Sequence, residues 1–393
     1  MDSRLLMSGC VQTPVEEEHV HPESIQPCLH PPRAGRRLTG HTPLHSRQQS
    51  NRGFGRPAQF AQGKTIRNGN ATHRWGVVLA GGDGVRLRPL TRFLCGDDRP
   101  KQFCPLLGDG TLLRDCLQRA ERSIASDQIL LPLTRAHRGY YQPDLAGHPC
   151  HRIVQPSNRG TAPAVLYPLL RICKMDRDAM VAILPCDHYY SEERLFTVAL
   201  ESAFAVAESR PKSVVLLGAR PKHPEVEYGW IEVGDAVDNS HHDTYFVTGF
   251  AEKPALPVAE RLLRSGALWN TFVMVGHVSA FLDMALASVP GLLLTLDSVA
   301  NHPRGSANET HIDDDVYDHL ASTDFSRQVL AQSANRLIAL GLGDMEWNDL
   351  GDPNRVISTL LQRDGEVPHW AKRWCTQGEN QHAAGACTSV AVA

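Results

Sequence analysis

Three glycines within four positions form the segment of this sequence best suited to binding phosphate. Gly81, Gly82 and Gly84 lie in GGDGVRLRPLT, residues 81–91. Because glycine has no Cβ, the backbone N–H groups of such a loop can approach and surround phosphate oxygens. Arg86 follows the glycines, and Lys101 lies fifteen residues further on in RPKQF. Two such cations can neutralise much of the charge of a triphosphate, so the segment predicts a triphosphate site.

Two common phosphate loops do not fit this segment. The dinucleotide-binding pattern requires a third glycine where Leu87 stands, and the Gly-Lys-Ser/Thr of a Walker A loop occurs nowhere in the chain. A glycine turn with a nearby arginine is also common after strands that bind nothing. The phosphate hypothesis therefore needs support from other parts of the sequence.

A candidate metal ligand follows another apolar run. Asp187 comes directly after AMVAILPC, residues 179–186. If that run is a buried strand, the carboxylate lies at the carboxyl edge of the sheet, where Mg²⁺ could bind both carboxylate and phosphate oxygens. The alternative is a capping aspartate before the helical segment that follows.

The elements around these residues alternate in type. Short apolar runs at 75–80, 128–134, 151–155, 179–185 and 213–219 predict buried strands, and the patterns at 111–124, 160–175 and 191–209 predict helices, with Thr111 as an N-cap. This alternation predicts an α/β fold with a Rossmann-like, mostly parallel sheet and helices on both faces. Binding residues should then gather at the strand ends.

The second half of the chain departs from simple alternation. YGWIEV and YFVTGFAEKP follow one another closely and predict a small antiparallel insertion, before helices at 257–265 and 278–288. Residues 1–73 have no sustained apolar period and are expected to be a disordered extension. We therefore expect a catalytic domain over 74–365 and a flexible tail over 366–393.

Composition limits the classes of partner. The formal net charge of −3 does not favour a nucleic-acid-binding surface. The longest apolar stretch, near 278–296, is interrupted by Asp283 and Pro290, so no membrane span is expected. The ten cysteines include no CxxC pair that would indicate a zinc site. We expect a cytoplasmic protein with small-molecule partners, no nucleic acid and no membrane.

Seven motifs, taken in order, resemble those of the sugar nucleotidyltransferases. They are GGDGVRLRPLT with RPKQF, QPSNRGTAPA (155–164), PCDHYY (185–190), EYGWIE (227–232), FAEKP (250–254), LWNTFVM (268–274) and WNDLGDP (347–353). RPKQF and GTAPA look most like the mannose-1-phosphate guanylyltransferases, in the monofunctional form without an isomerase domain. The resemblance implies the nucleotide-diphospho-sugar transferase type of fold.

This resemblance also implies a reaction and a set of site residues. The reaction is in-line transfer of GMP from GTP to mannose 1-phosphate, assisted by Mg²⁺, with release of pyrophosphate; a homo-oligomer is compatible with it. Arg86, Lys101, Asp187 and Lys253 are the implied catalytic residues, and Asp187 and Asp349 the metal ligands. The implied nucleotide-binding residues are Ala80, Gly81, Gly82, Gly84, Gln155, Asn158 and Thr161; those for the sugar phosphate are Gly229, Glu252, Lys253 and Asn270.

Several of these residues could instead have purely structural roles. Glu252 and Lys253 could form an ordinary surface ion pair, Thr161 could cap a helix, and Asp349 could belong to a simple turn. His188, next to Asp187, could reach phosphate or only satisfy backbone groups.

The sequence also departs from the family pattern. Val85 stands where the family usually has Thr, Asp83 adds a negative charge to the loop, and Val226-Glu227 replaces the usual Thr-Gly. Two other functions therefore remain open. One is a uridylyl- or thymidylyltransferase acting on another hexose 1-phosphate, and the other is a catalytically silent nucleotide-sugar-binding regulatory protein.

Overall fold

The computed structural model describes residues 73–237, 243–366 and 368–376. Apart from His73, the extension predicted over 1–73 lies outside the described residues, as does the chain beyond Thr376. Within the described ranges, no helix is both long enough and apolar enough to cross a membrane.

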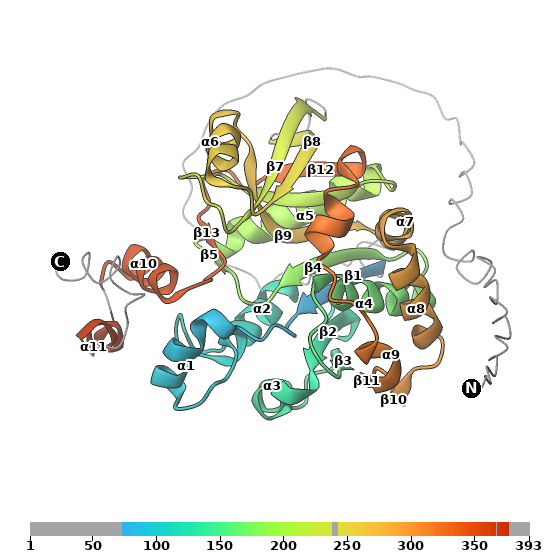
Figure 1. The fold of residues 1–393 in the computed structure, drawn as a ribbon, viewed down its shortest axis with the longest axis horizontal. Coiled ribbons are helices and arrows are strands. Elements are labelled where there is room, and N and C mark those ends of the chain that lie inside the picture. Colours follow the sequence, from blue (N-terminus) through green and yellow to red (C-terminus); the bar gives the residue numbers. More distant parts are fainter. Residues whose placement is uncertain (1–72, 238–242, 367, 377–393) are drawn as a thin grey trace, which may run out of the picture.

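One large twisted sheet organises the described chain (Figure 1). Its strand order is β10-β11-β3-β2-β1-β4-β9-β6-β12-β8-β7, and β1 pairs in parallel with both β2 and β4. The strands are β1 Arg74–Leu79, β2 Ile129–Thr134, β3 His151–Gln155, β4 Met180–Pro185, β6 Val214–Ala219, β7 Gly229–Ala236, β8 Thr244–Glu252, β9 Leu268–His277, β10 Arg304–Ser306, β11 Glu309–His311 and β12 Leu337–Gly341. β5 Tyr189–Tyr190 and β13 Trp347–Asn348 form a separate antiparallel pair.

The predicted mostly parallel sheet and its antiparallel insertion are confirmed, and antiparallel pairs also occur outside the insertion. β7 and β8 pair antiparallel, as expected for the insertion. β9 runs antiparallel between β4 and β6 near the centre of the sheet, and β10 pairs antiparallel with β11 at its edge. LWNTFVM therefore belongs to a central strand as well as to a motif.

Helices cover both faces of the sheet because strand residues alternate between two apolar cores. Val78 and Leu184 face α2 and α5, while Val77 and Ile183 face α4, α7 and α8. The helices are α1 Arg88–Cys95, α2 Leu112–Ala120, α3 Arg138–Asp144, α4 Thr161–Met175, α5 Glu193–Ser209, α6 Leu256–Arg264, α7 Val278–Ser288, α8 Pro290–Ala300, α9 Asp314–Asp318, α10 Pro353–Asp364 and α11 His369–Thr376. Thr111 caps α2 as predicted, since its hydroxyl accepts a hydrogen bond from the backbone of Arg114.

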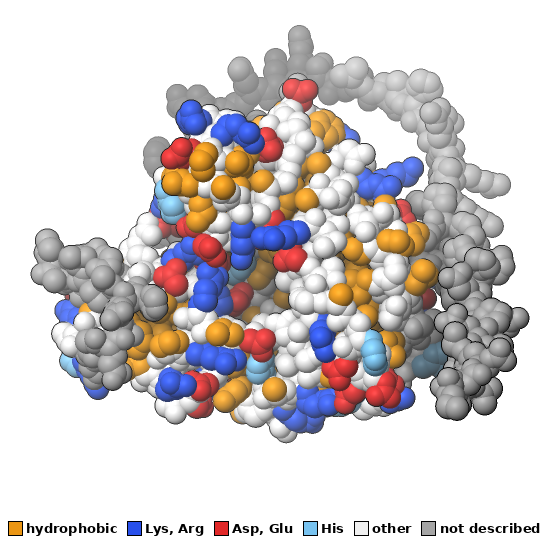
Figure 2. Space-filling model, viewed as in Figure 1, with side chains coloured by type: hydrophobic (Ala, Val, Ile, Leu, Met, Phe, Trp, Pro, Cys, Tyr) orange, Lys and Arg blue, Asp and Glu red, His pale blue; other side chains and the backbone are white. Residues whose placement is uncertain are grey.

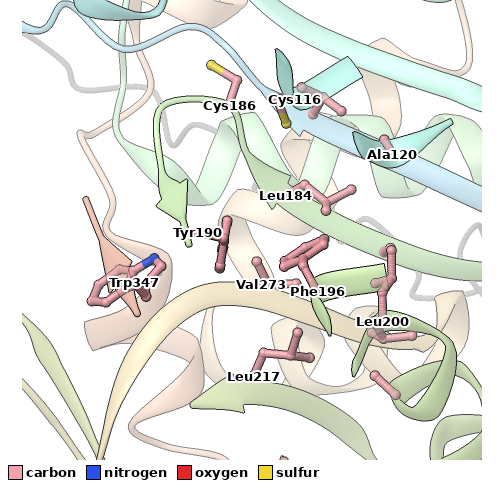
Figure 3. Close-up of a cluster of buried hydrophobic side chains, with 14 of the residues drawn as sticks. Cys116, Ala120, Leu184, Cys186, Tyr190, Phe196, Leu200, Leu217, Val273 and Trp347 are labelled. Atoms are coloured by element: carbon pink, nitrogen blue, oxygen red, sulfur yellow. The ribbon is translucent and has the colours of Figure 1, made fainter. Parts of the chain in front are cut away.

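The core on the α2 and α5 side supports the segments that follow β4 and β12 (Figure 3). Tyr190 of β5 packs against Phe196 of α5, with ring centroids 4.4 Å apart. Leu184, Leu217 and Val273 from three adjacent strands belong to the same buried cluster, as does Trp347 of β13. The segments that carry Asp187 and Asp349 are thus anchored in one apolar core.

A third apolar cluster corrects the expected flexible tail. Residues 369–376 form α11, whose Ala371 and Trp374 are buried. The Trp374 ring lies edge-on to Phe93 of α1, with centroids 5.3 Å apart. The spacing of three residues places both apolar side chains on one helix face, which gives this part of the tail a packing surface. The prediction of a tail without structure was wrong for this segment.

Candidate active site

A cleft of about 410 Å³ lies at the carboxyl ends of β1, β3 and β4 and brings most of the predicted site residues together. Figure 2 shows basic and acidic side chains gathered around a hollow near the centre of this face. The predicted residues that line the cleft are Gly81, Gly82, Arg86, Gln155, Asn158, Thr161, Asp187, Gly229, Glu252, Lys253, Asn270 and Asp349. Gly84 and Lys101 line an adjoining cavity that shares Arg86 and Asp187, and Ala80 is buried beneath the loop.

The glycine loop is held in shape by the RPKQF segment. Gly84 adopts φ 56°, and a Cβ there would lie 3.0 Å from the backbone nitrogen of Lys101, so both conformation and space favour glycine. The buried amide of Gln102 donates hydrogen bonds to the carbonyls of Ala80, at 3.1 Å, and Gly82, at 2.7 Å. Gln102 thus braces the loop, a role that the interpretation of RPKQF as a source of cations missed.

The carboxylate of Asp83 is contacted by the side chains of Asn158 and His137. The amide of Asn158 donates to its carboxylate at 3.1 Å, and His137 Nε2 lies 3.3 Å from the other oxygen. Burial lowers the pKa of His137, although Asp83 acts in the opposite direction. Asn158, one of the implied nucleotide-binding residues, therefore uses one amide N–H on Asp83 while still lining the cleft.

Lys101 connects the two candidate metal ligands. Its ammonium lies 3.1 Å from Asp187 Oδ2 and donates to the backbone carbonyls of Asp349, at 2.5 Å, and Leu350, at 3.2 Å. The side chain is largely buried, at 11% exposure, so its charge is poorly solvated. The ammonium therefore depends on these ion-pair and hydrogen-bond partners for its stabilisation. Lys101 thereby fixes the segments after β4 and β13 relative to one another.

The Asp349 carboxylate is positioned by a second set of contacts. Tyr228 and Arg355 donate to its Oδ1 at 3.2 and 2.8 Å, and the backbone of Gly351 donates to the same oxygen at 2.9 Å. Asp349 is largely buried, and although burial alone would raise the pKa of its carboxyl, the charges of Lys101 and Arg355 hold it below the ordinary value. The group is therefore ionised at neutral pH, as a metal ligand must be.

The two carboxylates fit a magnesium ion only in combination with a substrate. Among the described residues, no group of three or more His, Cys, Asp and Glu side chains is arranged to hold a metal. Asp187 and Asp349 nevertheless line the same cleft, and the described donors to the Asp349 side chain all reach Oδ1. Mg²⁺ commonly binds through one or two carboxylates plus substrate phosphates, which matches this donor set.

His188 lies in the cleft beside Asp187, and its ring makes side-chain contacts. Its Nδ1 is 3.3 Å from the indole N–H of Trp347, and its Nε2 is 3.6 Å from Asp187 Oδ1. Burial lowers the pKa of His188. Trp347, a buried aromatic of the core, therefore also orients a cleft residue.

The opposite wall of the cleft is built from β7, β8 and β9. A Cβ on Gly229 would lie 2.7 Å from Glu252 Oε2 and 3.3 Å from Asn270 Cβ, so glycine keeps this pocket open. Asn270 is 7% exposed, and its side-chain oxygen accepts from the backbone of Phe272. Its amide N–H groups can still serve a ligand hydroxyl.

Strained backbone marks this region. Lys253, Phe272 and Leu350 adopt positive φ angles of 49°, 59° and 48°. Such conformations cost energy for residues with side chains and collect at functional sites. Lys253 is held by a hydrogen bond from its backbone nitrogen to the carbonyl of Tyr228.

The end of the cleft near α4 includes residues that the sequence did not reveal. Thr161 is the first residue of α4, and its hydroxyl accepts from the backbone of Phe325 at 2.8 Å, so it does not cap its own helix. This contact places Asp324 and Ser326 in the cleft wall. The amide oxygen of Gln155 accepts from Tyr317, which orients the amide N–H group. No motif signals Asp324 or Ser326.

The nucleotidyl transferase family model matches residues 75–290, more than half of the chain. The chain belongs to the nucleotidyl transferase family. This finding confirms the family recognised from the motifs and the assignment of the chain to the nucleotidyltransferases. Asp349 lies outside the matched range, in the segment that Lys101 ties to the cleft.

Two curated relatives match at least 70% of this chain. The xanthan biosynthesis protein XanB of Xanthomonas campestris is 27% identical over 294 residues, 74% of this chain and 60% of XanB. A mannose-1-phosphate guanylyltransferase of Escherichia coli is 26% identical over 283 residues, 70% of this chain and 59% of the relative. The match thus spans about 60% of the length of these curated relatives.

Two solved structures share the fold. A crystal structure from Thermus thermophilus, described as a mannose-1-phosphate geranyltransferase, superposes with a TM-score of 0.63 at 28% identity, covering 74% of this chain and 80% of that one. A Helicobacter pylori protein described as a mannose-6-phosphate isomerase has a TM-score of 0.57 at 18% identity, covering 70% and 99%, and supports the fold alone. The predicted fold class is confirmed.

Glu252 gives this nucleotidyl transferase a titrating group near neutral pH. Burial, with a contribution from Asp324, raises the pKa of its carboxyl to about 7, against the opposing effects of Lys253, Arg327 and Ser326. The folded state favours the neutral form of Glu252, so the protonated carboxyl contributes to the stability of the fold. This contribution is complete below the unfolded pKa and is lost as pH rises through about 7. The free energy of unfolding of Glu252→Gln, measured in urea relative to the wild type, should therefore be higher at pH 8 than at pH 5.

The control for this prediction is Glu192→Gln, which removes the same charge from an exposed position. Its stability difference from the wild type gives the baseline for removing one surface charge over that pH range. A Glu252→Gln difference with the same pH dependence as this baseline would show that Glu252 does not titrate near neutral pH.

Proposed function

We propose that this protein transfers GMP from GTP to mannose 1-phosphate, forming GDP-mannose and pyrophosphate with the assistance of Mg²⁺. The observation that carries the proposal is the convergence on one cleft of the glycine loop, the carboxylates of Asp187 and Asp349, and the cations Arg86 and Lys253. The named guanylyltransferase relatives support the choice of base and sugar.

The chain's own residues would act mainly by positioning and charge. The reaction brings a phosphate dianion to the α-phosphorus of a triphosphate, so repulsion and alignment are the main obstacles. In our proposal the loop amides at 81–84 and Arg86 hold the triphosphate, while Lys253 holds the sugar phosphate. The attacking oxygen is already a phosphate anion, so no protein nucleophile is needed. Gly229, Glu252 and Asn270 orient the sugar hydroxyls.

Magnesium would be held by Asp187 and Asp349 and would supply charge neutralisation at the reacting phosphates. Lys101 keeps these two segments together, through contacts to Asp187 and to the carbonyl of Asp349. Gln155, Asn158 and Thr161 form the proposed wall around the base.

The test is pyrophosphate release in a grid of nucleotides and sugars. GTP, ATP, UTP and dTTP are each combined with mannose 1-phosphate or glucose 1-phosphate in the presence of Mg²⁺. We expect release that requires both substrates and is fastest with GTP and mannose 1-phosphate. A preference for UTP or dTTP with glucose 1-phosphate would replace the base and sugar assignment while retaining the reaction.

One observation favours a different function, a nucleotide-sugar-binding regulatory protein without turnover. Arg86 and Lys253, the proposed phosphate cations, both lie near the carboxylate of Glu227, at 3.2 and 4.0 Å. Nucleotide binding without pyrophosphate release in any combination would support this alternative.

The N-terminal extension gives a further prediction. Among the described residues, β1 begins at Arg74 and His73 pairs with Asp176, and the sequence before them has no sustained apolar period. Deleting residues 1–72 should leave kcat/KM nearly unchanged. A loss beyond about tenfold, or roughly 1.4 kcal/mol of transition-state stabilisation, would place the extension in the catalytic unit.

A further inference from the structure

Glu227 stands where the cleft would receive a phosphate group. Its Oε2 lies 3.2 Å from Arg86 Nη1 and 4.0 Å from Lys253 Nζ, and all three side chains line the cleft. One carboxylate oxygen thus faces both cations. A phosphate oxygen in the same place would face the same two cations.

The ion pairs of Glu227 with Arg86 and Lys253 are solvent-exposed and can be displaced by a ligand. The side chains of Arg86, Glu227 and Lys253 are 54%, 47% and 43% exposed. Ion pairs with this much solvent contact add little to stability, so the fold does not depend on them. A phosphate dianion carries more charge than a carboxylate and offers more acceptor oxygens, so it can displace Glu227.

The backbone of Glu227, in contrast, is fixed. Its N–H donates to Glu225 Oε1 at 2.9 Å, and Glu225 Oε2 accepts from Arg355 at 2.7 Å. Arg355 also donates to Asp349 Oδ1. Displacement of Glu227 therefore requires only rotation of its side chain, while the network that positions Asp349 stays intact.

We propose that Glu227 is an internal counter-ion that lies between Arg86 and Lys253, the proposed triphosphate and sugar-phosphate cations, and competes with phosphorylated ligands for them. The inference rests on the proposed function for the identity of the substrate, mannose 1-phosphate. It assigns to Glu227 the role of lowering phosphate affinity at a site whose two cations have no other ion-pair partner among the described residues. The Val226-Glu227 departure from the family pattern thereby acquires a physical role.

The test compares Glu227→Gln with the wild type in calorimetric titrations with mannose 1-phosphate and, separately, with pyrophosphate. The substitution keeps the shape of the side chain and removes its charge. We expect the variant to bind both ligands about three- to tenfold more tightly, as the loss of one or two exposed ion pairs implies. The gain should shrink in high salt, and unphosphorylated mannose should bind both proteins equally.

Asp235→Asn is the matched control, because it removes one carboxylate from the exposed far end of β7. It should leave both affinities at their wild-type values, and thermal unfolding should show that both variants are folded. Unchanged or weaker binding of both ligands by Glu227→Gln would contradict the proposed counter-ion role of Glu227. Tighter binding of pyrophosphate, without any binding of mannose 1-phosphate, would support that role and reject the proposed substrate.

Discussion

Asp187→Asn should lower kcat for Mg²⁺-dependent pyrophosphate release by at least about 100-fold, since loss of a metal ligand removes several kcal/mol of charge stabilisation. The amide has the same shape but cannot supply the negative charge that a hard cation requires. Asp187 also faces Lys101 across 3.1 Å, so the substitution removes half of an ion pair. Steady-state kinetics over a range of Mg²⁺ concentrations is the measurement.

Two comparisons make this result specific. Asp127→Asn removes a carboxylate from an exposed turn before β2 and should retain full activity. Circular dichroism and thermal unfolding should show that Asp187→Asn remains folded. Undiminished turnover at every Mg²⁺ concentration would remove Asp187 from the mechanism.

Lys101→Met should affect both activity and stability. Methionine keeps much of the apolar stem, but Asp187 and the carbonyls of Asp349 and Leu350 lose the ammonium that they share. We expect kcat/KM to fall at least about 100-fold, and the free energy of unfolding to fall by roughly 1–3 kcal/mol, because partly buried polar groups lose their partner. Enzyme kinetics and urea unfolding test the two effects.

Lys174→Met provides a matched control for the stability effect. Lys174 of α4 forms a partly buried ion pair with Asp297 of α8 at 2.7 Å, and neither residue lines the cleft. This variant should lose comparable stability and keep its kcat/KM. If Lys101→Met loses stability but retains wild-type kcat/KM and Mg²⁺ dependence, Lys101 is only a structural tie.

The motifs that can be recognised in the sequence lie where backbone conformation or burial restricts which residue types fit. The glycine loop after β1 is visible in sequence because positive φ and close backbone approach at Gly84 exclude most side chains. Apolar runs predicted β1, β2, β3, β4 and β6 to within a residue or two, since buried parallel strands need apolar side chains on both faces. The helical period predicted α4, α5 and α7 for a similar reason.

Other features depend on which distant segments become neighbours. β9 lies between β4 and β6, and no local pattern specifies that order. The helix at 369–376 was missed because its stability comes from packing Trp374 on Phe93, far away in sequence. Helices this short form mainly through such tertiary contacts.

The sequence by itself determined the alternation of strands and helices, the phosphate-binding type of loop, and the family whose motifs appear in order. Only the tertiary structure decided that Lys101 joins Asp187 to the Asp349 segment, that Asp324 and Ser326 enter the cleft, and that Glu227 faces both Arg86 and Lys253. The physical reason is that backbone conformation and burial periodicity are local properties. Charge pairing across a cleft is set by sheet order and by strand-end geometry, which emerge only when the whole chain packs.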